Sequence, residues 1–246
     1  PSSSPSLSFY PEGGQLVNGM INQVAFKALW PGGQAATISG AVYNSHDELQ
    51  CSFSTLHEGM GSFSFMPHAG ESYYARYDYA NTSIETRLPA AQATATSLHT
   101  RWENDSLQVS VLRSASMPAD TCYLLIHRQG VPTYFQPWDF SRKTSHWSKK
   151  DFSTGVSHLM LLNKDFKVLS ERLIFNNRYD DPEVEITVDS ASYQPRAKVS
   201  LDIRLPGASA DTLPSSLAIS VTDDKDVRPD TTSNIVSEIL LSSELE

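Results

Sequence analysis

Short segments in which apolar and polar residues alternate recur along the whole chain and constrain its fold most strongly. They include residues 24–28, 61–65, 107–111, 184–188 and 199–203. Because successive side chains of a strand point to opposite faces, this period of two indicates sheets with one buried face and one solvated face. Turn-forming Gly, Pro, Asn and Asp residues separate the segments at short intervals. The pattern predicts an all-β fold built of tandem immunoglobulin-like β-sandwiches.

One stretch near the end of the chain has the period of a helix instead. Within residues 233–245, Ser233 or Asn234 can serve as the N-cap. Four aliphatic residues then share one stripe of the helix: Ile235, Val236, Ile239 and Leu240. Burying each such side chain contributes roughly 1.5–3 kcal/mol, so the stripe should be covered. We expect this short C-terminal helix to pack on the sheet formed by residues 184–221 or on a neighbouring molecule.

Two shifts in composition divide the chain. Residues 88–97 form an Ala/Thr/Gln run with little to pack, and residues 176–182 are polar and end in a proline. We therefore predict three domains, comprising residues 1–92, 93–181 and 182–246. The first two have the usual length of a β-sandwich, whereas the third is short and is expected to be truncated.

Charge and hydropathy exclude two classes of partner. The chain has 28 acidic and 19 basic residues, for a formal net charge of −9. Nucleic-acid binding over the whole surface needs clustered Lys and Arg, so we expect no nucleic-acid partner. Apolar runs such as residues 159–162 are far shorter than the roughly 18–20 residues that span a bilayer. We expect no membrane-spanning segment in this chain.

The sequence contains no recognisable catalytic or metal-binding motif. Its seven histidines form no His-x-x-x-His or His-x-His pair, and there is no Gly-x-Ser-x-Gly turn. The densest carboxylate group, Asp223, Asp224 and Asp226, could hold a hard cation, but it lacks the Gly and distal Glu of an EF-hand loop. We interpret it as a solvated loop. The prediction is a protein that is not an enzyme, with no catalytic, cofactor-binding or metal-binding residues and no cofactor.

The two cysteines, Cys51 and Cys122, share no metal-ligand spacing. Each lies inside a strand-like run, residues 49–53 and 122–126, and we interpret both as buried thiols that behave as small hydrophobes.

Aromatic residues offer one alternative function. Tyr73, Tyr77 and Tyr79 alternate along one face, and Trp138 lies close to Phe135 and Phe140 in the sequence. Flat sugars stack on such faces, so a glycan-binding module is a possible reading. Core filling explains aromatic residues of sandwiches more often.

Several stretches of the chain resemble the macroglobulin-like domain arrays of large bacterial envelope proteins, especially those of Bacteroidota. The first is FYPEGGQLVNG at 9–19, followed by HEGMGSFSFMP at 57–67 and YYAR at 73–76. The second is GVSHLMLLN at 155–163 with ERLIF at 171–175. The third is YQPR at 193–196 with LAISVTD at 217–223. Their order and spacing resemble that family across nearly the whole chain.

This resemblance implies two complete macroglobulin-like sandwiches and a truncated third with the terminal helix. It implies a segment of a longer protein, with a signal peptide upstream of Pro1 and sometimes a TonB-receptor-type or carboxypeptidase-regulatory-like region. The implied location is the cell envelope, either periplasmic or outer-membrane-associated. Three Asp-Ser/Thr-apolar triplets, at 105–107, 189–191 and 211–213, resemble acceptors of envelope O-glycosylation in the same bacterial group and agree with that location.

The function that the resemblance implies is a non-catalytic scaffold or interaction segment. Its expected partners are other domains of the same parent chain, envelope proteins or proteases. One alternative is a part of a protease-trapping macroglobulin that acts as an endopeptidase inhibitor. However, the Gly-Cys-Gly-Glu-Gln thioester motif of such proteins is present at neither Cys51 nor Cys122. The other alternative is the glycan-binding sandwich described above.

Overall fold

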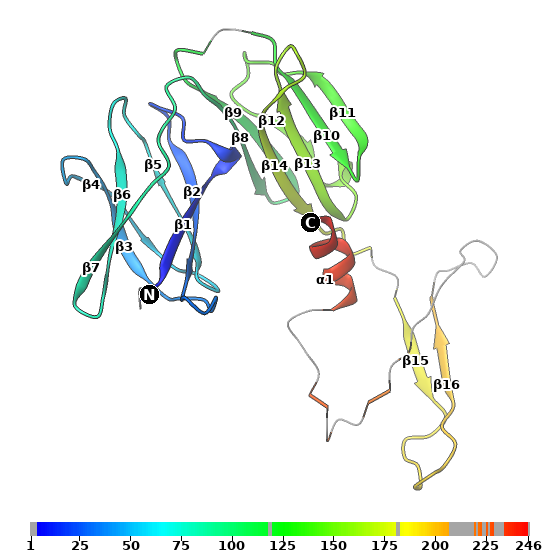
Figure 1. Ribbon diagram of the computed structural model, residues 1–246. Helices are drawn as coiled ribbons and strands as arrows, with labels where there is room; N and C mark the ends of the chain where they lie inside the picture. The colour runs from blue at the N-terminus through cyan, green and yellow to red at the C-terminus, as the bar shows by residue number, and fades with distance from the viewer. Residues whose placement is uncertain are drawn as a thin grey trace. The chain divides into compact units, whose positions relative to one another are not determined.

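The computed structural model describes residues 4–117, 120–180, 183–206, 219, 221–222, 225, 227–228 and 234–245. Two compact units make up the chain. The first comprises Pro1–Phe152 and Val156–Asn176, and the second comprises Ser153–Gly155 and Asn177–Glu246. Antiparallel sheets dominate, which confirms the all-β prediction of tandem sandwiches (Figure 1). The division into three domains at 92/93 and 181/182 stays a prediction.

The first sandwich packs a three-stranded sheet, β1-β2-β5, on a four-stranded sheet, β4-β3-β6-β7 (Figure 1). The strands are β1 (Ser6–Pro11), β2 (Asn22–Leu29), β3 (Ser39–Asn44), β4 (Leu49–Ser54), β5 (Met60–Phe65), β6 (Tyr73–Tyr79) and β7 (Thr82–Arg87). A short 3-10 helix, η1 (Glu12–Gly14), follows β1.

The alternation seen in the sequence decides which side chains enter the first core. In β2, Val24, Phe26 and Ala28 are buried while the residues between them are not. The ring of Phe26 lies 5.0 Å from that of Phe53 in the opposite sheet. Phe63 lies opposite Val24 on the neighbouring strand and is 5% exposed. The two sheets are therefore joined by interlocking aromatic rings, which supply large buried area.

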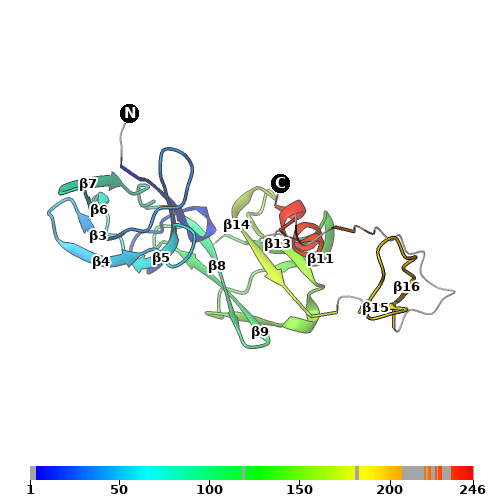
Figure 2. The same ribbon diagram turned by 90° about the horizontal axis from the view of Figure 1, so that it is seen from below.

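The second sandwich has the same construction. It packs the four-stranded sheet β11-β10-β13-β14 on the three-stranded sheet β12-β9-β8. The strands are β8 (Thr96–Glu103), β9 (Ser106–Arg113), β10 (Tyr123–Arg128), β11 (Val131–Pro137), β12 (Ser145–Ser148), β13 (Gly155–Leu162) and β14 (Val168–Asn176). A second 3-10 helix, η2 (Lys149–Asp151), follows β12. The strands β8 and β14 lie beside each other (Figure 2).

Aliphatic side chains fill the second core. Leu107 and Val109 come from one sheet, Leu124 and Ile126 from the other, and all four are at most 1% exposed. This core is a separate cluster from the aromatic core of the first sandwich.

The interpretation of both cysteines as buried thiols is confirmed for Cys122, whereas Cys51 is only half-buried. Cys51 packs against the first core, Cys122 belongs to the second, and both thiols are free. Burial raises the pKa of Cys51 to about 11 and also raises that of Cys122. Both thiols are therefore protonated at neutral pH, which makes them poor nucleophiles.

The second unit contains a two-stranded sheet of β15 (Glu185–Val188) and β16 (Leu201–Arg204). Ile186 pairs with Ile203 and Val188 with Leu201, so these four apolar side chains share one face. The unit also contains the helix α1 (Ile235–Leu240), which is followed by η3 (Ser242–Glu244). The Asn234 side chain caps α1, as the sequence allowed. Within the described residues, no helix has the length and apolar character that a bilayer crossing requires.

The predicted packing of the helix on the sheet of its own chain is wrong for the described residues. The side chains of Ile235 and Ile239 are 71% and 57% exposed, and Ile186 on the sheet is 62% exposed. The helix has only six residues and the sheet only two strands, so neither element offers enough surface to hold the other in place. Packing on a neighbouring molecule stays a prediction.

Candidate functional site: the junction of the two sandwiches

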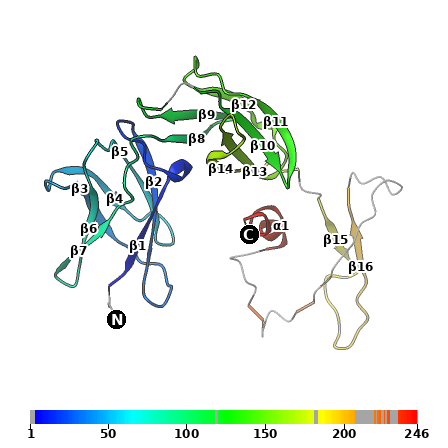
Figure 3. The same ribbon diagram turned by 45° about the horizontal axis from the view of Figure 1, so that its top comes forward.

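The two sandwiches of the first unit meet at the short helix η1. This helix reaches from the end of β1 to β8 and β14 of the second sandwich (Figure 3). Its central residue, Gly13, has a φ of 72°. A Cβ atom at Gly13 would lie 2.8 Å from the backbone nitrogen of Leu98. Only glycine combines this left-handed backbone with such a close approach, so Gly13 allows the two sandwiches to touch.

Serine hydroxyls of the second sandwich hold the backbone of η1. Ser97 donates a hydrogen bond of 2.7 Å to the carbonyl oxygen of Glu12, and Ser170 donates one of the same length to that of Gly13. The Ser170 hydroxyl also accepts a 2.9 Å hydrogen bond from the backbone nitrogen of Leu98. Ser97 and Ser170 are both buried. The polar groups of η1 are therefore satisfied by the second sandwich rather than by water.

The Glu12 side chain carries the charge of the junction. It is only 11% exposed, and its Oε2 atom lies 3.0 Å from Nδ1 of His99. Its Oε1 atom accepts hydrogen bonds of 3.0 Å from the backbone nitrogen of Thr100 and from Nε of Arg172. Thus one carboxylate of the first sandwich binds β8 and β14 of the second sandwich at once.

Electrostatics favour the ionised form of Glu12. Burial by itself opposes ionisation, but the hydrogen bonds from His99 and Thr100 and the positive charge of Arg172 outweigh it. The pKa of Glu12 is therefore held below its ordinary value. A hydrogen-bonded ionised group of this kind contributes about 1.5–3 kcal/mol for each contact, less where a partner such as Arg172 is partly exposed. The arrangement is suited to holding two bodies together.

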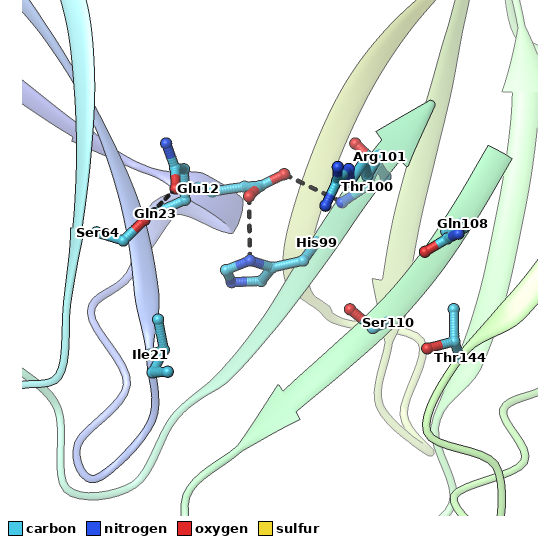
Figure 4. A pocket seen from close by; sticks show the side chains of 10 residues that line it. All are labelled: Glu12, Ile21, Gln23, Ser64, His99, Thr100, Arg101, Gln108, Ser110 and Thr144. Atoms are coloured by element: carbon cyan, nitrogen blue, oxygen red, sulfur yellow. Dashed lines mark hydrogen bonds and ion pairs between the residues drawn. The ribbon is translucent and has the colours of Figure 1, made fainter. Parts of the chain in front are cut away.

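A cleft of about 490 Å³ opens beside Glu12, with walls from both sandwiches (Figure 4). Its lining is almost entirely polar: Glu12, Ile21, Gln23, Ser64, His99, Thr100, Arg101, Gln108, Ser110 and Thr144. On the first sandwich, Ser64 is hydrogen-bonded to Gln23. Nε2 of His99 is buried and has no hydrogen-bond partner among the described residues. Most side chains of the cleft carry hydrogen-bond donors or acceptors, so it suits a polar ligand or the polar rim of a protein contact.

Most of the aromatic residues considered for sugar stacking lie in the cores of the sandwiches. This finding corrects the hypothesis that they form a glycan-binding face. Tyr73 and Tyr77 are each 2% exposed and Trp138 is 8% exposed. Tyr79 is half-buried with its ring 5.3 Å from that of Trp30. These side chains lie on the inward faces of their strands, and no ring face remains for a sugar at Tyr73 or Tyr77. Of the set, Phe135 is exposed, at 44%.

The carboxylates considered as a cation site, Asp223, Asp224 and Asp226, lie outside the described residues. Where side chains are described, His, Cys, Asp and Glu residues form no group of three that could hold a metal ion. Of the glycosylation-like triplets, residues 189–191 are exposed and follow β15, whereas residues 105–107 begin in the turn before β9 and end at Leu107, which is buried in the second core. The third, at 211–213, is outside the described part of the chain.

Sequence reasoning missed the Glu12 site. Its partner Arg172 is 160 positions away, and the contact depends on how two sandwiches meet. The Gly13-Gly14 pair directly after Glu12 did indicate that another part of the backbone approaches closely here. It did not indicate which segment of the chain that would be.

Comparisons with known proteins return structural neighbours only. No family model matches the chain, and no curated protein matches it. Among solved structures, the chain is similar to native E. coli alpha-2-macroglobulin, with 11% identity and a TM-score of 0.29 over 82% of this chain and 16% of that one. Salmonella alpha-2-macroglobulin reacted with methylamine gives 10% identity and a TM-score of 0.27 over 84% of this chain and 19% of that one.

Fibronectin(III)-like modules of Clostridium thermocellum CbhA are similar as well. They give 11% identity and a TM-score of 0.27 over 70% of this chain and 94% of that one. The match thus spans less than a fifth of the length of either macroglobulin and nearly all of the fibronectin(III)-like modules.

Proposed function

We propose that this chain is a non-catalytic scaffold and interaction segment of a larger macroglobulin-like protein of the bacterial cell envelope. The observation that carries the scaffold role is the Glu12 junction, in which one buried carboxylate holds β8 and β14 of the second sandwich. The motif resemblance of residues 9–19 and 155–163 supports the macroglobulin-like parent and the envelope location.

The junction gives the scaffold a composite surface. The cleft beside Glu12 is lined by Gln23 and Ser64 from the first sandwich and by Ser110 and Thr144 from the second. Such a surface exists only while the two sandwiches keep their mutual orientation. A partner that contacts both walls therefore depends on the orientation that Glu12 maintains.

Photo-cross-linking in cells tests this proposal. A photoreactive residue replaces Ser110 in the cleft of the full-length protein, and a second version carries it at Leu56, an 80% exposed position of the first sandwich. We expect Ser110 to capture an envelope protein or another domain of the parent chain. Adding Glu12→Ala should abolish that product while the products from Leu56 stay unchanged. Equal capture from Ser110 with and without Glu12→Ala contradicts a junction-dependent surface.

Location and activity are tested separately. The full-length protein should fractionate with the envelope, and its recovery in the cytoplasmic fraction contradicts the proposal. Incubation with broad-specificity proteases should leave no shielded protease bound, because a scaffold has no trapping step. A protease retained after cleavage favours the trapping alternative instead.

A further inference from the structure

The first sandwich has an open sheet edge at β7. This strand is hydrogen-bonded to β6, and within the described part of the chain no other strand pairs with it (Figure 1). Its register with β6 runs without a bulge from Tyr79 opposite Thr82 to Tyr74 opposite Arg87. Such an edge presents unpaired backbone donors and acceptors, to which a further strand can add.

Other edges of the two sandwiches carry features that oppose the addition of a strand. β11 contains Pro132 and Pro137 and shifts register against β10. β4 shifts register against β3, β12 has four residues, and β1 ends in Pro11. Prolines, bulges and short length are common protections of sheet edges. β7 has six residues and contains none of these features.

The hydrogen bonds between β6 and β7 determine which backbone groups of β7 face outward. The N–H of Leu88, directly after β7, donates a 2.9 Å hydrogen bond to the carbonyl oxygen of Tyr73. In an antiparallel pair, residues that bond to the neighbouring strand alternate with residues that do not. Counting back from Leu88, the even-numbered residues of β7 bond to β6. The odd-numbered residues direct their N–H and C=O groups to the open edge: Ser83, Glu85 and Arg87.

Charges along the open edge restrict the chemistry of a partner. Glu85 and Arg87 lie two residues apart, so they share the outer face of the sheet. Glu85 forms a 2.8 Å ion pair with Arg76, whereas Arg87 has no ion-pair partner among the described residues. An acidic residue opposite Arg87 and a basic residue opposite Glu85 would each form a favourable cross-strand pair.

A cleft of about 410 Å³ lies at the end of β7, where the acidic residue of the partner would be placed. Residues 70–73 and 87–91 line it. The carboxylate of Glu71 in this lining accepts hydrogen bonds from the hydroxyl of Tyr73 and the side chain of Asn44. The guanidinium of Arg87 is thus the charged group of the cleft that is available to a partner.

The inner side of the same edge favours apolar residues. Ile84 lies opposite the buried Tyr77 and packs against the first core, but it is only partly buried. Tyr79 also packs against that core and is half-buried. Alternate side chains of an added strand would point to this side and cover the exposed flank of Ile84.

A second copy of β7 fits this edge poorly. Antiparallel pairing over all three outward residues would place Glu85 of one copy opposite Glu85 of the other. Like charges directly opposite each other are destabilising. The edge therefore favours an extended segment of a different sequence.

We propose that β7 binds an extended segment of a partner polypeptide, which adds to the sheet as an antiparallel strand with an acidic residue opposite Arg87 and a basic residue opposite Glu85. Main-chain hydrogen bonds to the outward residues of β7 provide affinity, and the side chains between them provide selectivity. The proposal goes beyond the scaffold function, because this edge belongs to the first sandwich alone and does not depend on the Glu12 junction.

Binding of the peptide acetyl-DVKVT-amide to the 246-residue chain tests the proposal. An NMR titration up to about 10 mM peptide should give a dissociation constant of roughly 0.1–1 mM. Amide hydrogen exchange at Ser83, Glu85 and Arg87 should slow by about 10-fold at a peptide concentration of about ten times that constant. Exchange at Ile84 and Thr86 should stay unchanged, because their N–H groups already bond to β6.

The matched control peptide, acetyl-KVDVT-amide, has the same composition with the two charges exchanged. It places a lysine opposite Arg87 and an aspartate opposite Glu85, so it should bind about 10-fold more weakly.

A pair of variants separates the backbone from the charge. Glu85→Pro removes an outward N–H without removing a bond to β6, and it should weaken binding of acetyl-DVKVT-amide by at least about 10-fold. Glu85→Gln keeps that N–H and should weaken binding by less than about 3-fold. Tryptophan fluorescence checks that each variant is folded.

Several results would overturn the proposal. They are no binding of acetyl-DVKVT-amide up to about 10 mM, equal binding of the two peptides, and wild-type binding by folded Glu85→Pro. Slowed exchange at Ser83, Glu85 and Arg87 that depends on the concentration of the chain alone would show that a second copy occupies the edge, which also overturns it. If Glu85→Pro does not fold, the exchange pattern of the wild type decides, since protection elsewhere than at these three amides contradicts strand addition at β7.

Discussion

The first and second units contain the same kind of strand, yet among the described residues only the first unit buries its apolar side chains. In β2, Phe26 is 1% exposed, whereas Ile186 in β15 is 62% exposed although both lie in alternating segments. The difference is the second layer: β2 faces another sheet, whereas in the part of the chain that the structure describes β15 pairs with β16 alone. Alternation therefore makes a strand amphipathic, but a domain core needs a further layer to cover the apolar face.

Removing a core ring should have the largest effect and should be confined to the first unit. Phe26→Ala deletes a side chain that contacts Phe53 and Phe63, and we expect a loss of about 3–5 kcal/mol in the free energy of unfolding. Urea unfolding followed by tryptophan fluorescence measures it. A loss below about 1 kcal/mol would mean that the first core is not packed as described.

The junction should be the next most sensitive position. Glu12→Gln keeps the shape of the side chain but removes the charge that faces His99 and Arg172. We expect the first unit to lose about 1–3 kcal/mol of unfolding free energy. Glu85→Gln, which removes an exposed ion pair with Arg76, is the control and should change the transition little. Equal effects from the two variants would contradict the importance of burial at Glu12.

Acidification should reproduce the effect of Glu12→Gln. The pKa of Glu12 in the folded chain lies below its ordinary value of 4.5. Its contribution is therefore fully present above about pH 4.5 and is lost as pH falls through the lower folded-state value. The stability difference between wild type and Glu12→Gln, from urea titrations at several pH values, should shrink over that window. A difference that persists unchanged at pH 2 would show that ionisation of Glu12 is not its source.

The smallest effect is expected in the second unit. Ile186→Asp changes a side chain that is 62% exposed and should leave unfolding of the first unit unchanged within about 0.5 kcal/mol. A large loss in the first unit would show that the two units share a core. The same experiment on Ile239→Asp should give the same result, since this helix side chain is 57% exposed.

Local patterns predicted the strands well because strand formation at these positions depends on near neighbours. Residues 24–28, 61–65 and 107–111 all lie within observed strands. The sequence did not predict which face would be inward for Tyr73 and Tyr77, because a period of two defines shared faces without saying which of them is covered. It also predicted a longer helix than the six residues of α1.

The Glu12 site could not be predicted from the sequence for a further reason. It combines residues from segments that come together only in the folded chain, as Glu12, Thr100 and Arg172 do. Single-sequence patterns describe neighbours along the chain, and this site is made of neighbours in space.

The central claim is that Glu12 holds the two sandwiches in one fixed orientation. Backbone residual dipolar couplings measure this directly, because each sandwich reports its own alignment tensor. The account predicts tensors of the same magnitude and orientation for the two sandwiches of the wild type. It predicts tensors of different magnitude in Glu12→Ala. Different tensors in the wild type, or a single shared tensor in Glu12→Ala, would contradict it.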